Sequence, residues 1–367
     1  MDVDEAELSR LLDAVTEPDL GLPLGELSMV REVRERRGRV SVVVALPVED
    51  WPGVDLLEVA VRDALGALGG LRDLKLTFVE MTPAERSSLI ERLAPGRGGA
   101  KPNRLAERRS RTRVVGVSSG KGGVGKSSVT VNLAVALAAA GKKVGLLDAD
   151  VYGFSVPKML GVERAPAVID DLVIPPVAHG VRCLSMGFFV PDDQPVIWRG
   201  PMLHKALEQF VVDAYWGEPD FLLVDMPPGT GDVALSLGQH LPTSEILVVT
   251  TPQPAAQRVA QRSAYAARKL DLPVRGVIEN MSWFTGGDGI RYELFGAGGG
   301  AQLAEALGVP LLAQVPLVPA VREGADVGVP VRLSDPSSEA SQVFDALGER
   351  LAALGPARVY RSELTLR

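Results

Sequence analysis

The feature that most constrains this chain is a glycine-rich loop that leads from an apolar strand into a helix. Val114–Val117 reads as a buried strand, and Ser127–Ala140 has the apolar content of a helix. The residues between them fit G-x-x-x-x-G-K-S, a pattern in which backbone N–H groups ring a phosphate and the helix dipole adds positive charge. We therefore expect a nucleotide phosphate site formed by Gly120, Lys121, Gly122, Gly123, Val124, Gly125, Lys126, Ser127 and Ser128.

Acidic residues follow two of the apolar runs that come after the loop. Asp148 and Asp150 lie just past Val144–Leu147, and Asp225 ends the run FLLVD. Ligands of parallel sheets bind beyond the carboxyl ends of the strands, so these carboxylates are expected beside the nucleotide. Asp148 and Asp225 are predicted to hold Mg²⁺ together with the Ser127 hydroxyl. Asp150 is predicted to orient the attacking water.

The predicted activity is ATP hydrolysis with Mg²⁺. In the loop pattern, Lys126 is placed to reach the β and γ phosphates. The stiff turn PPG after Asp225 brings the Gly229 N–H close to the γ-phosphate, where it can report that this phosphate is present. Lys126 and Asp150 are the catalytic residues in this hypothesis.

Apolar runs alternate with helical stretches over most of the chain. Predicted strands are Val114–Val117, Val144–Leu147, Phe221–Val224, Ile246–Val249, Val274–Ile278 and Leu311–Val315, and predicted helices are Ser127–Ala140, Leu203–Tyr215, Ala255–Leu270 and Gln302–Leu307. Continuous apolar strands separated by helices predict an α/β fold with a doubly wound, mostly parallel sheet. Residues 114–367 are assigned to this P-loop ATPase domain.

A smaller α+β domain is predicted over residues 1–94. Helical spacing over Glu5–Ala14, Asp55–Leu68 and Pro83–Leu93 combines there with the strand-like runs Val40–Leu46 and Leu74–Phe78. Residues 95–113 contain Gly, Pro and seven basic residues against one acidic residue. They are interpreted as a solvated linker, and the alternative is a docking strip for an acidic partner or nucleic acid.

Several motifs of the chain resemble those of known ATPase families. The loop K-G-G-x-G-K-S, with Lys121 in addition to Lys126, resembles the loop of ATPases related to MinD, ParA and the nitrogenase iron protein. In that class the additional lysine reaches the nucleotide of the partner subunit, which implies a homodimer and a catalytic role for Lys121 similar to that of an arginine finger. The stretches DADVYGFSVPKMLG, WRGPM, DMPPGTGD, TTPQ, NMSWF, LFGAGGG and VPLVPAVREGADVGVPV look like Mrp-type iron–sulfur cluster carrier ATPases over about residues 110–355.

The resemblance implies a role in iron–sulfur cluster assembly. The N-terminal domain is similar to the small iron–sulfur assembly domain often fused ahead of such ATPases. The family is expected to bind ATP, to hydrolyse it slowly as a homodimer, and to carry a [4Fe–4S] cluster to apoprotein clients or together with other assembly factors. The resemblance also favours two residues for base recognition: Asn280, whose amide can read the edge of adenine, and Pro316, which can flank the base.

Cysteine usage is where the chain departs from this family. Its members hold the cluster at the dimer interface through a C-x-x-C pair, but the corresponding interval Thr285–Leu294 contains no cysteine, and Trp51 stands about where many relatives have one in the small domain. A cluster needs thiolates, usually four, and the sole thiol, Cys183, reads as a core residue. The remaining candidates, Asp288, His179, His204 and His240, would be poor ligands. The residues of this chain argue against a cluster site at the dimer interface, whereas the family resemblance implies a role in iron–sulfur cluster assembly.

The composition of the chain limits the classes of partner that we expect it to bind. A chain of 367 residues with a net charge of −7 fits two globular domains and argues against general nucleic-acid binding. No apolar run approaches the roughly 18 residues of a membrane helix, and the acidic start MDVDEAELSR lacks signal-peptide regions. We expect a cytoplasmic protein with neither nucleic acid nor membrane as a partner.

Two other functions stay open at the level of the residues. A positioning ATPase of the MinD or ParA kind would load on a membrane through a basic amphipathic C-terminal helix, whereas the end LGERLAALGPARVYRSELTLR has a Gly-Pro break and mixed charges. A metal-free adaptor would use ATP to gate a surface formed by the small domain and the linker. The missing cysteines favour this second alternative.

Overall fold

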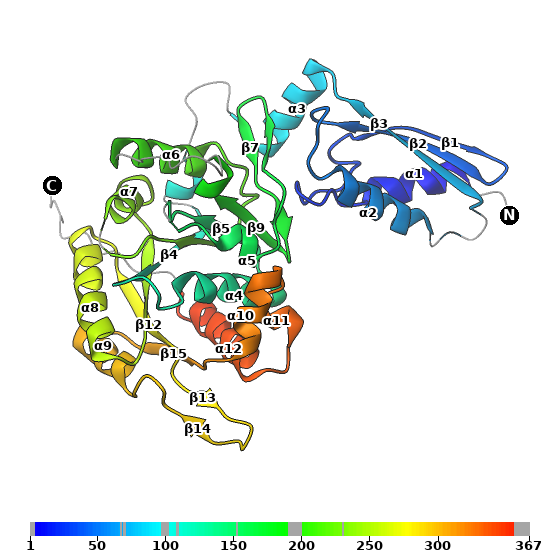
Figure 1. Ribbon diagram of the computed structural model, residues 1–367. Helices are drawn as coiled ribbons and strands as arrows, with labels where there is room; N and C mark the ends of the chain where they lie inside the picture. The colour runs from blue at the N-terminus through cyan, green and yellow to red at the C-terminus, as the bar shows by residue number, and fades with distance from the viewer. Residues whose placement is uncertain are drawn as a thin grey trace. The chain divides into compact units, whose positions relative to one another are not determined.

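The computed structural model describes residues 4–66, 68, 71–96, 103–107, 110–151, 153–189, 200–229 and 231–355. The chain forms two compact units, each with its own apolar core (Figure 1). The smaller unit gathers Met1–Pro102, Arg164–Val177 and Asp213–Gly217, and the larger one gathers Asn103–Glu163, Ala178–Val212 and Glu218–Arg367. Within the described residues, no helix is both long and apolar enough to span a bilayer.

An eight-stranded sheet with the order β15-β12-β11-β4-β10-β5-β9-β8 forms the centre of the larger unit. Its strands are β4 (Arg113–Ser119), β5 (Val144–Asp148), β8 (Val177–Ala178), β9 (Val181–Ser185), β10 (Phe221–Asp225), β11 (Glu245–Thr250), β12 (Val274–Asn280) and β15 (Leu311–Val315). All pairings from β15 to β9 are parallel. Apart from Arg113 at the start of β4, the central strands β4, β10 and β11 are buried along their whole length, which explains their mostly apolar sequences. The predicted α/β fold with a mostly parallel sheet is confirmed.

Helices cover both faces of this sheet (Figure 1). They are α4 (Lys126–Ala139), α5 (Val156–Met159), α6 (Gly200–Val212), α7 (Asp232–His240), α8 (Pro254–Lys269), α9 (Gly299–Leu307), α10 (Pro319–Val327), α11 (Val331–Ser334) and α12 (Glu339–Ala353), with short 3-10 helices at Arg104–Ala106 and Met186–Phe189. Helix α4 is apolar on nearly all sides because it packs between the sheet and α12. A two-stranded hairpin, β13 (Phe284–Thr285) and β14 (Arg291–Tyr292), follows β12.

The smaller unit contains a three-stranded sheet with the order β1-β2-β3, in which β1–β2 is antiparallel and β2–β3 parallel. Its elements are α1 (Glu5–Ala14), β1 (Val30–Arg36), β2 (Arg39–Leu46), α2 (Val54–Gly66), β3 (Asp73–Glu80) and α3 (Pro83–Leu93). Strand β1, with the sequence VREVRER, has no fully buried side chain, so its sequence carries no apolar pattern that would have predicted it. Helix α3 begins with a capping box between Thr82 and Glu85, followed by Pro83 at its first position.

A hairpin that is distant in sequence completes the smaller unit. Strands β6 (Ala167–Ile169) and β7 (Leu172–Ile174) place apolar side chains in its core. The backbone of Val173 accepts a hydrogen bond from Tyr215 N at 2.8 Å, and Val173 N donates to Asp213 O at 2.9 Å. These bonds hold Asp213–Gly217 extended, so α6 ends at Val212 and not at Tyr215 as predicted. Each unit therefore gathers separate stretches of chain, where the sequence suggested three consecutive segments.

Part of the predicted linker lies in the described residues. Within Asn103–Glu107, Leu105 is buried in the larger unit, and Asn103 Nδ2 donates to the carbonyl of His240 at 2.8 Å. This short stretch is packed on the unit and is not a fully solvated connector. Residues 97–102, 108 and 109 of the linker lie outside the described part of the chain.

Candidate nucleotide site

The phosphate loop runs from the carboxyl end of β4 to the first turn of α4. Gly123 and Gly125 have φ of 79° and 78°, a region that residues with a Cβ rarely adopt. Gly120 lies so close to α8 that a Cβ there would be 2.2 Å from the backbone nitrogen of Ala260. The loop glycines are therefore required by the turn itself and by its close packing on α8.

A cavity of about 270 Å³ opens over this loop. It is lined by Ser119 and residues 121–128, together with Asp150, Gly153, Ser155, Met159 and Pro228. The predicted loop residues from Lys121 to Ser128 all line it, as does Asp150. The backbone N–H groups of the loop and the N-terminus of α4 give the cavity the positive character that phosphates require.

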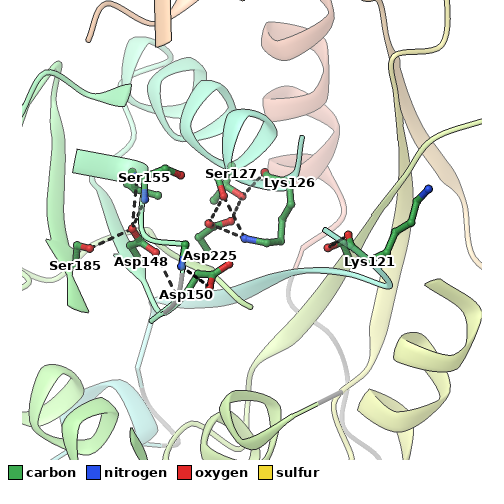
Figure 2. Close-up of polar contacts among 12 residues, drawn as sticks. Lys121, Lys126, Ser127, Asp148, Asp150, Ser155, Ser185 and Asp225 are labelled. Carbon is green, nitrogen blue, oxygen red and sulfur yellow. Dashed lines mark hydrogen bonds and ion pairs between the residues drawn. The ribbon is translucent and has the colours of Figure 1, made fainter. Parts of the chain in front are cut away.

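Lys126, Ser127 and Asp225 meet at the base of the cavity (Figure 2). Lys126 Nζ lies 2.6 Å from Asp225 Oδ2, and the Ser127 hydroxyl donates to the same oxygen at 2.6 Å. Thr130 Oγ1 lies 2.9 Å from Asp225 Oδ1 and 2.8 Å from the Lys126 carbonyl, and its single proton serves one of these acceptors at a time. Lys126 and Asp225 are both buried, so each charge is compensated by the other.

Asp148 lies beside Asp225 on the neighbouring strand but has different contacts. Its carboxylate accepts hydrogen bonds from the backbone nitrogens of Asp150, Ser155 and Val156 at 3.2–3.3 Å, and from the Ser185 hydroxyl at 3.1 Å. Burial, with a smaller contribution from the charge of Asp225, raises the pKa of Asp148 to about 7. Asp148 is fully buried, so in this structure it holds the loop from Asp150 to Val156 in place and does not face the cavity.

The other predicted residues surround this centre. Asp150 lines the cavity and accepts a hydrogen bond from Gly153 N at 3.2 Å. The side chain of Lys121 points away from Lys126 and Asp225 (Figure 2). Gly229 has φ of 98°, and its N–H donates to the Ser119 carbonyl at 2.8 Å, so here it is engaged by the strand that precedes the loop.

The two residues predicted for base recognition lie at the carboxyl ends of the adjacent strands β12 and β15, Asn280 as the last residue of β12 and Pro316 just after β15. Asn280, the last residue of β12, is in register with Val315, which directly precedes Pro316. The Asn280 amide donates to the Val124 carbonyl at 2.9 Å. A Cβ on Gly125 would lie 2.3 Å from the Asn280 amide nitrogen, so this glycine also makes room for Asn280. Asn280 therefore contacts the phosphate loop directly.

Sequence reasoning missed two residues that orient the carboxylates. Thr130 lies one helical turn after Lys126, and this i,i+4 spacing was a usable signal that its hydroxyl faces the same carboxylate. Ser185, at the end of β9, bonds Asp148, and only the pairing of β9 with β5 brings them together. No local pattern in the sequence predicted that pairing.

The positions where cluster-binding cysteines were expected are filled by other side chains. In the hairpin, Arg291 stacks on Trp283 with its guanidinium carbon 4.3 Å from the ring centre, and both residues bond Glu339. In the smaller unit, the Trp51 indole donates to the buried Glu17 at 3.0 Å. Cys183 lies fully buried in β9, and burial raises the pKa of its thiol well above the usual value.

The described residues therefore do not fit a bridging iron–sulfur cluster. Among them there is no group of three or more His, Cys, Asp or Glu side chains that could hold a metal ion. The prediction that Cys183 is a core residue is confirmed. Asp288 bonds the Tyr292 hydroxyl at 2.6 Å and Ile290 N at 3.0 Å, which stabilises the turn of the hairpin.

Comparisons with known proteins agree with the architecture of both units. Residues 110–352 match the family described as NUBPL iron-transfer P-loop NTPase, and residues 5–77 match the family described as iron-sulfur cluster assembly protein. The chain is 42% identical over 359 residues to the iron-sulfur cluster carrier protein of Mycobacterium leprae, with 94% of this chain and 93% of that protein covered. It is 44% identical over 348 residues to the protein of the same name from Deinococcus radiodurans, with 94% of each chain covered.

Solved structures resemble about two thirds of the chain. A nucleotide-binding protein from Archaeoglobus fulgidus in complex with ADP matches with a TM-score of 0.56 at 31% identity, covering 66% of this chain and 97% of that one. The septum site-determining protein MinD from Pyrococcus horikoshii, complexed with Mg-ADP, matches with a TM-score of 0.51 at 27% identity, covering 66% and 97%. The P-loop cavity, the parallel sheet and these relatives lead to one assignment: the chain belongs to the iron–sulfur cluster carrier family of P-loop NTPases.

Proposed function

We propose that this chain binds Mg²⁺–ATP in the cavity over the phosphate loop and hydrolyses it. The observation that carries the proposal is the contact of Lys126 and Ser127 with one buried carboxylate, Asp225, at the base of the cavity over the glycine loop. A nucleotide would draw Lys126 to its β and γ phosphates. Asp225 and the Ser127 hydroxyl would then be available to Mg²⁺, which prefers oxygen ligands.

Asp150 is the residue proposed to orient the attacking water. It lines the cavity and its Oδ1 is positioned by Gly153 N, so its orientation is set by the loop that Asp148 anchors. Asp148 is proposed to contribute to the magnesium site through this loop, because its own oxygens already accept four hydrogen bonds. Gly229, Asn280 and Pro316 are proposed to contact the γ-phosphate and the base.

The active form is proposed to be a homodimer in which Lys121 acts on the partner's nucleotide. The direction of its side chain, away from the Lys126–Asp225 pair of its own chain, supports this role (Figure 2). A cation delivered between subunits is worth about 10³–10⁵ in rate in related phosphoryl transfers. Hydrolysis is then expected to be slow unless a second subunit, or a client bound to it, completes the site.

The proposed role is to promote, with ATP, the transfer of iron–sulfur clusters between other assembly factors and apoproteins. The hairpin that would bridge a cluster is instead folded by Trp283, Arg291 and Glu339, so we propose that this chain does not ligate a [4Fe–4S] cluster directly. The second candidate is a metal-free adaptor gated by ATP. The absence of cysteine from residues 285–294 supports it, because an adaptor needs no cluster ligand.

Three substitutions test the nucleotide chemistry. Lys126→Ala should abolish ATP binding measured by calorimetry, because it removes the phosphate ligand and leaves Asp225 unpaired. Asp150→Ala should keep ATP binding and lose phosphate release. Full turnover by Asp150→Ala would refute its assignment. Lys121→Ala should lose turnover and keep ATP affinity, and mixing it with Asp150→Ala should restore part of the activity if the lysine acts between subunits.

Anaerobic reconstitution with iron and sulfide tests the cluster. We expect iron well below the four atoms per dimer of one cubane cluster. Full loading would contradict this, and loss of that iron in Cys183→Ala would then identify Cys183 as a ligand. The carrier and the adaptor are distinguished by supplying a preformed cluster and an apoprotein client, since only a carrier makes cluster transfer depend on ATP.

A further inference from the structure

Two of the three histidines of the chain face each other between α6 and α7. His204 Nε2 and His240 Nε2 are 2.9 Å apart, and the two ring centres are 4.3 Å apart with a tilt of 43°. If the two rings met end to end, the distance between their centres would equal the Nε2–Nε2 distance plus the distance from each Nε2 atom to the centre of its own ring. The observed ring centres are closer than that, so at least one ring is inclined to the line that joins the two Nε2 atoms.

The hydrogen bonds around His204 favour one tautomer. The Ser236 hydroxyl lies 2.8 Å from the Asp232 carbonyl and 2.9 Å from His204 Nδ1. Because a carbonyl oxygen cannot donate, both contacts are hydrogen bonds only when Ser236 donates to Asp232 and accepts from His204 Nδ1. In that arrangement His204 Nε2 carries a lone pair on the side of the second ring. A hydrogen bond to one ring nitrogen orients the histidine ligands of metals in the same way.

The separation of the two nitrogens fits one coordination geometry. With metal–nitrogen bonds of about 2.0–2.1 Å, two ligands at a right angle lie about 2.8–3.0 Å apart, whereas a tetrahedral angle separates them by about 3.3–3.4 Å. The observed 2.9 Å matches the first case. From these contacts we propose that His204 and His240 form a chelating site for a transition-metal ion of square-planar or octahedral preference, such as Ni²⁺ or Cu²⁺.

The surroundings of the two rings determine what else can coordinate the ion. Both rings are half-buried, so solvent can complete the coordination. No third protein ligand stands within the described residues, but Glu208 lies one turn after His204 on α6, is exposed, and acts on His240 electrostatically.

Binding would tie α6 to α7. His240 is the last residue of α7, the helix that follows the loop after Asp225, and its carbonyl accepts the hydrogen bond from Asn103. On binding, the proton of His240 Nε2 moves to Nδ1, so a neutral pair takes up the cation without net release of a proton. The proposed site is separate from the phosphate loop, which prefers hard cations with oxygen ligands.

Titration of the full-length chain with Ni²⁺ tests the proposal. Calorimetry is carried out without chelators and in excess Mg²⁺, which occupies the oxygen ligands of the nucleotide site. We expect one equivalent of Ni²⁺ per chain, lost in His204→Ala and in His240→Gln. His179→Ala is the matched control, because the third histidine bonds the Gly328 carbonyl elsewhere and its removal should leave the Ni²⁺ affinity unchanged.

Ser236→Ala tests whether the hydrogen bond between Ser236 and His204 contributes to the Ni²⁺ affinity. It removes no ligand but releases His204 Nδ1, and loss of a hydrogen bond that orients a ligand typically weakens metal binding about 10–100-fold. Unchanged ATP affinity of each variant serves as the control for folding. The proposal is overturned if the unaltered chain takes up no Ni²⁺, or if His204→Ala and His240→Gln retain the same stoichiometry and affinity.

Discussion

Glu17 should make the smaller unit less stable as the pH rises through the neutral range. Its carboxylate is fully buried beneath Trp51 and accepts hydrogen bonds from the Trp51 indole and from the backbone nitrogens of Asp19 and Leu20. These donors favour the ionised form, but burial outweighs them, and the pKa of Glu17 is raised from 4.5 to about 7.

The sign follows from proton binding in the two states. Between pH 4.5 and 7 the folded state keeps the proton of Glu17, whereas the unfolded chain has released it. The folded state therefore binds more protons in this window, and the free energy of unfolding falls as the pH rises. An interval of about 2.5 pH units, at 1.36 kcal/mol for each, corresponds to about 3 kcal/mol. The stabilisation by Glu17 is fully present below its pKa in the unfolded chain, 4.5, and is lost as the pH rises through its pKa in the folded chain, about 7.

Trp51 provides a local probe of this effect. With 5-fluorotryptophan incorporated, the folded and unfolded ¹⁹F resonances of Trp51, assigned with Trp51→Phe, report the unfolding of its own surroundings in urea at pH 5, 6, 7 and 8. In Glu17→Gln the pH dependence should disappear, even though the amide leaves one donor facing another and lowers stability at every pH. If the Trp51 transition has the same pH dependence in the unaltered chain and in the Glu17→Gln variant, Glu17 is not the cause of that dependence.

Three further perturbations test other parts of the structure. Arg164→Ala should destabilise the smaller unit by about 3–5 kcal/mol, because Asp19 loses its bidentate partner and stays buried; urea denaturation measures this, and Arg164→Lys should recover only part of it. Cys183 should not react with a thiol reagent until the chain is unfolded, since its thiol is buried and its pKa is raised, and rapid labelling of the native chain would contradict the burial. Thr130→Val should lower stability by about 1–3 kcal/mol by leaving a buried acceptor without its donor, and Thr130→Ser should restore it in the same melting assay.

The sequence predicted the parts of the fold that depend on local pattern. Buried parallel strands such as β4 and β10 need apolar residues on both faces, so their positions follow from the sequence. The phosphate loop could also be predicted from the sequence, because its glycines have backbone angles and close packing that residues with a Cβ rarely allow. Strand β1 and the hairpin of β6 and β7 could not be found, since they are short or only partly buried and depend on pairing with distant strands.

By itself, the sequence determined that the chain has a phosphate loop, a mostly parallel α/β sheet, a small α+β unit and a single thiol. Each of these depends on the residues present and on spacing along a few neighbouring positions. Tertiary structure alone decided that Asp148 anchors a loop through Ser185, that Trp283, Arg291 and Glu339 lock the cysteine-free hairpin, and that His204 and His240 meet. These contacts join residues far apart in the sequence, and only the packing of strands and helices brings their side chains within hydrogen-bonding distance.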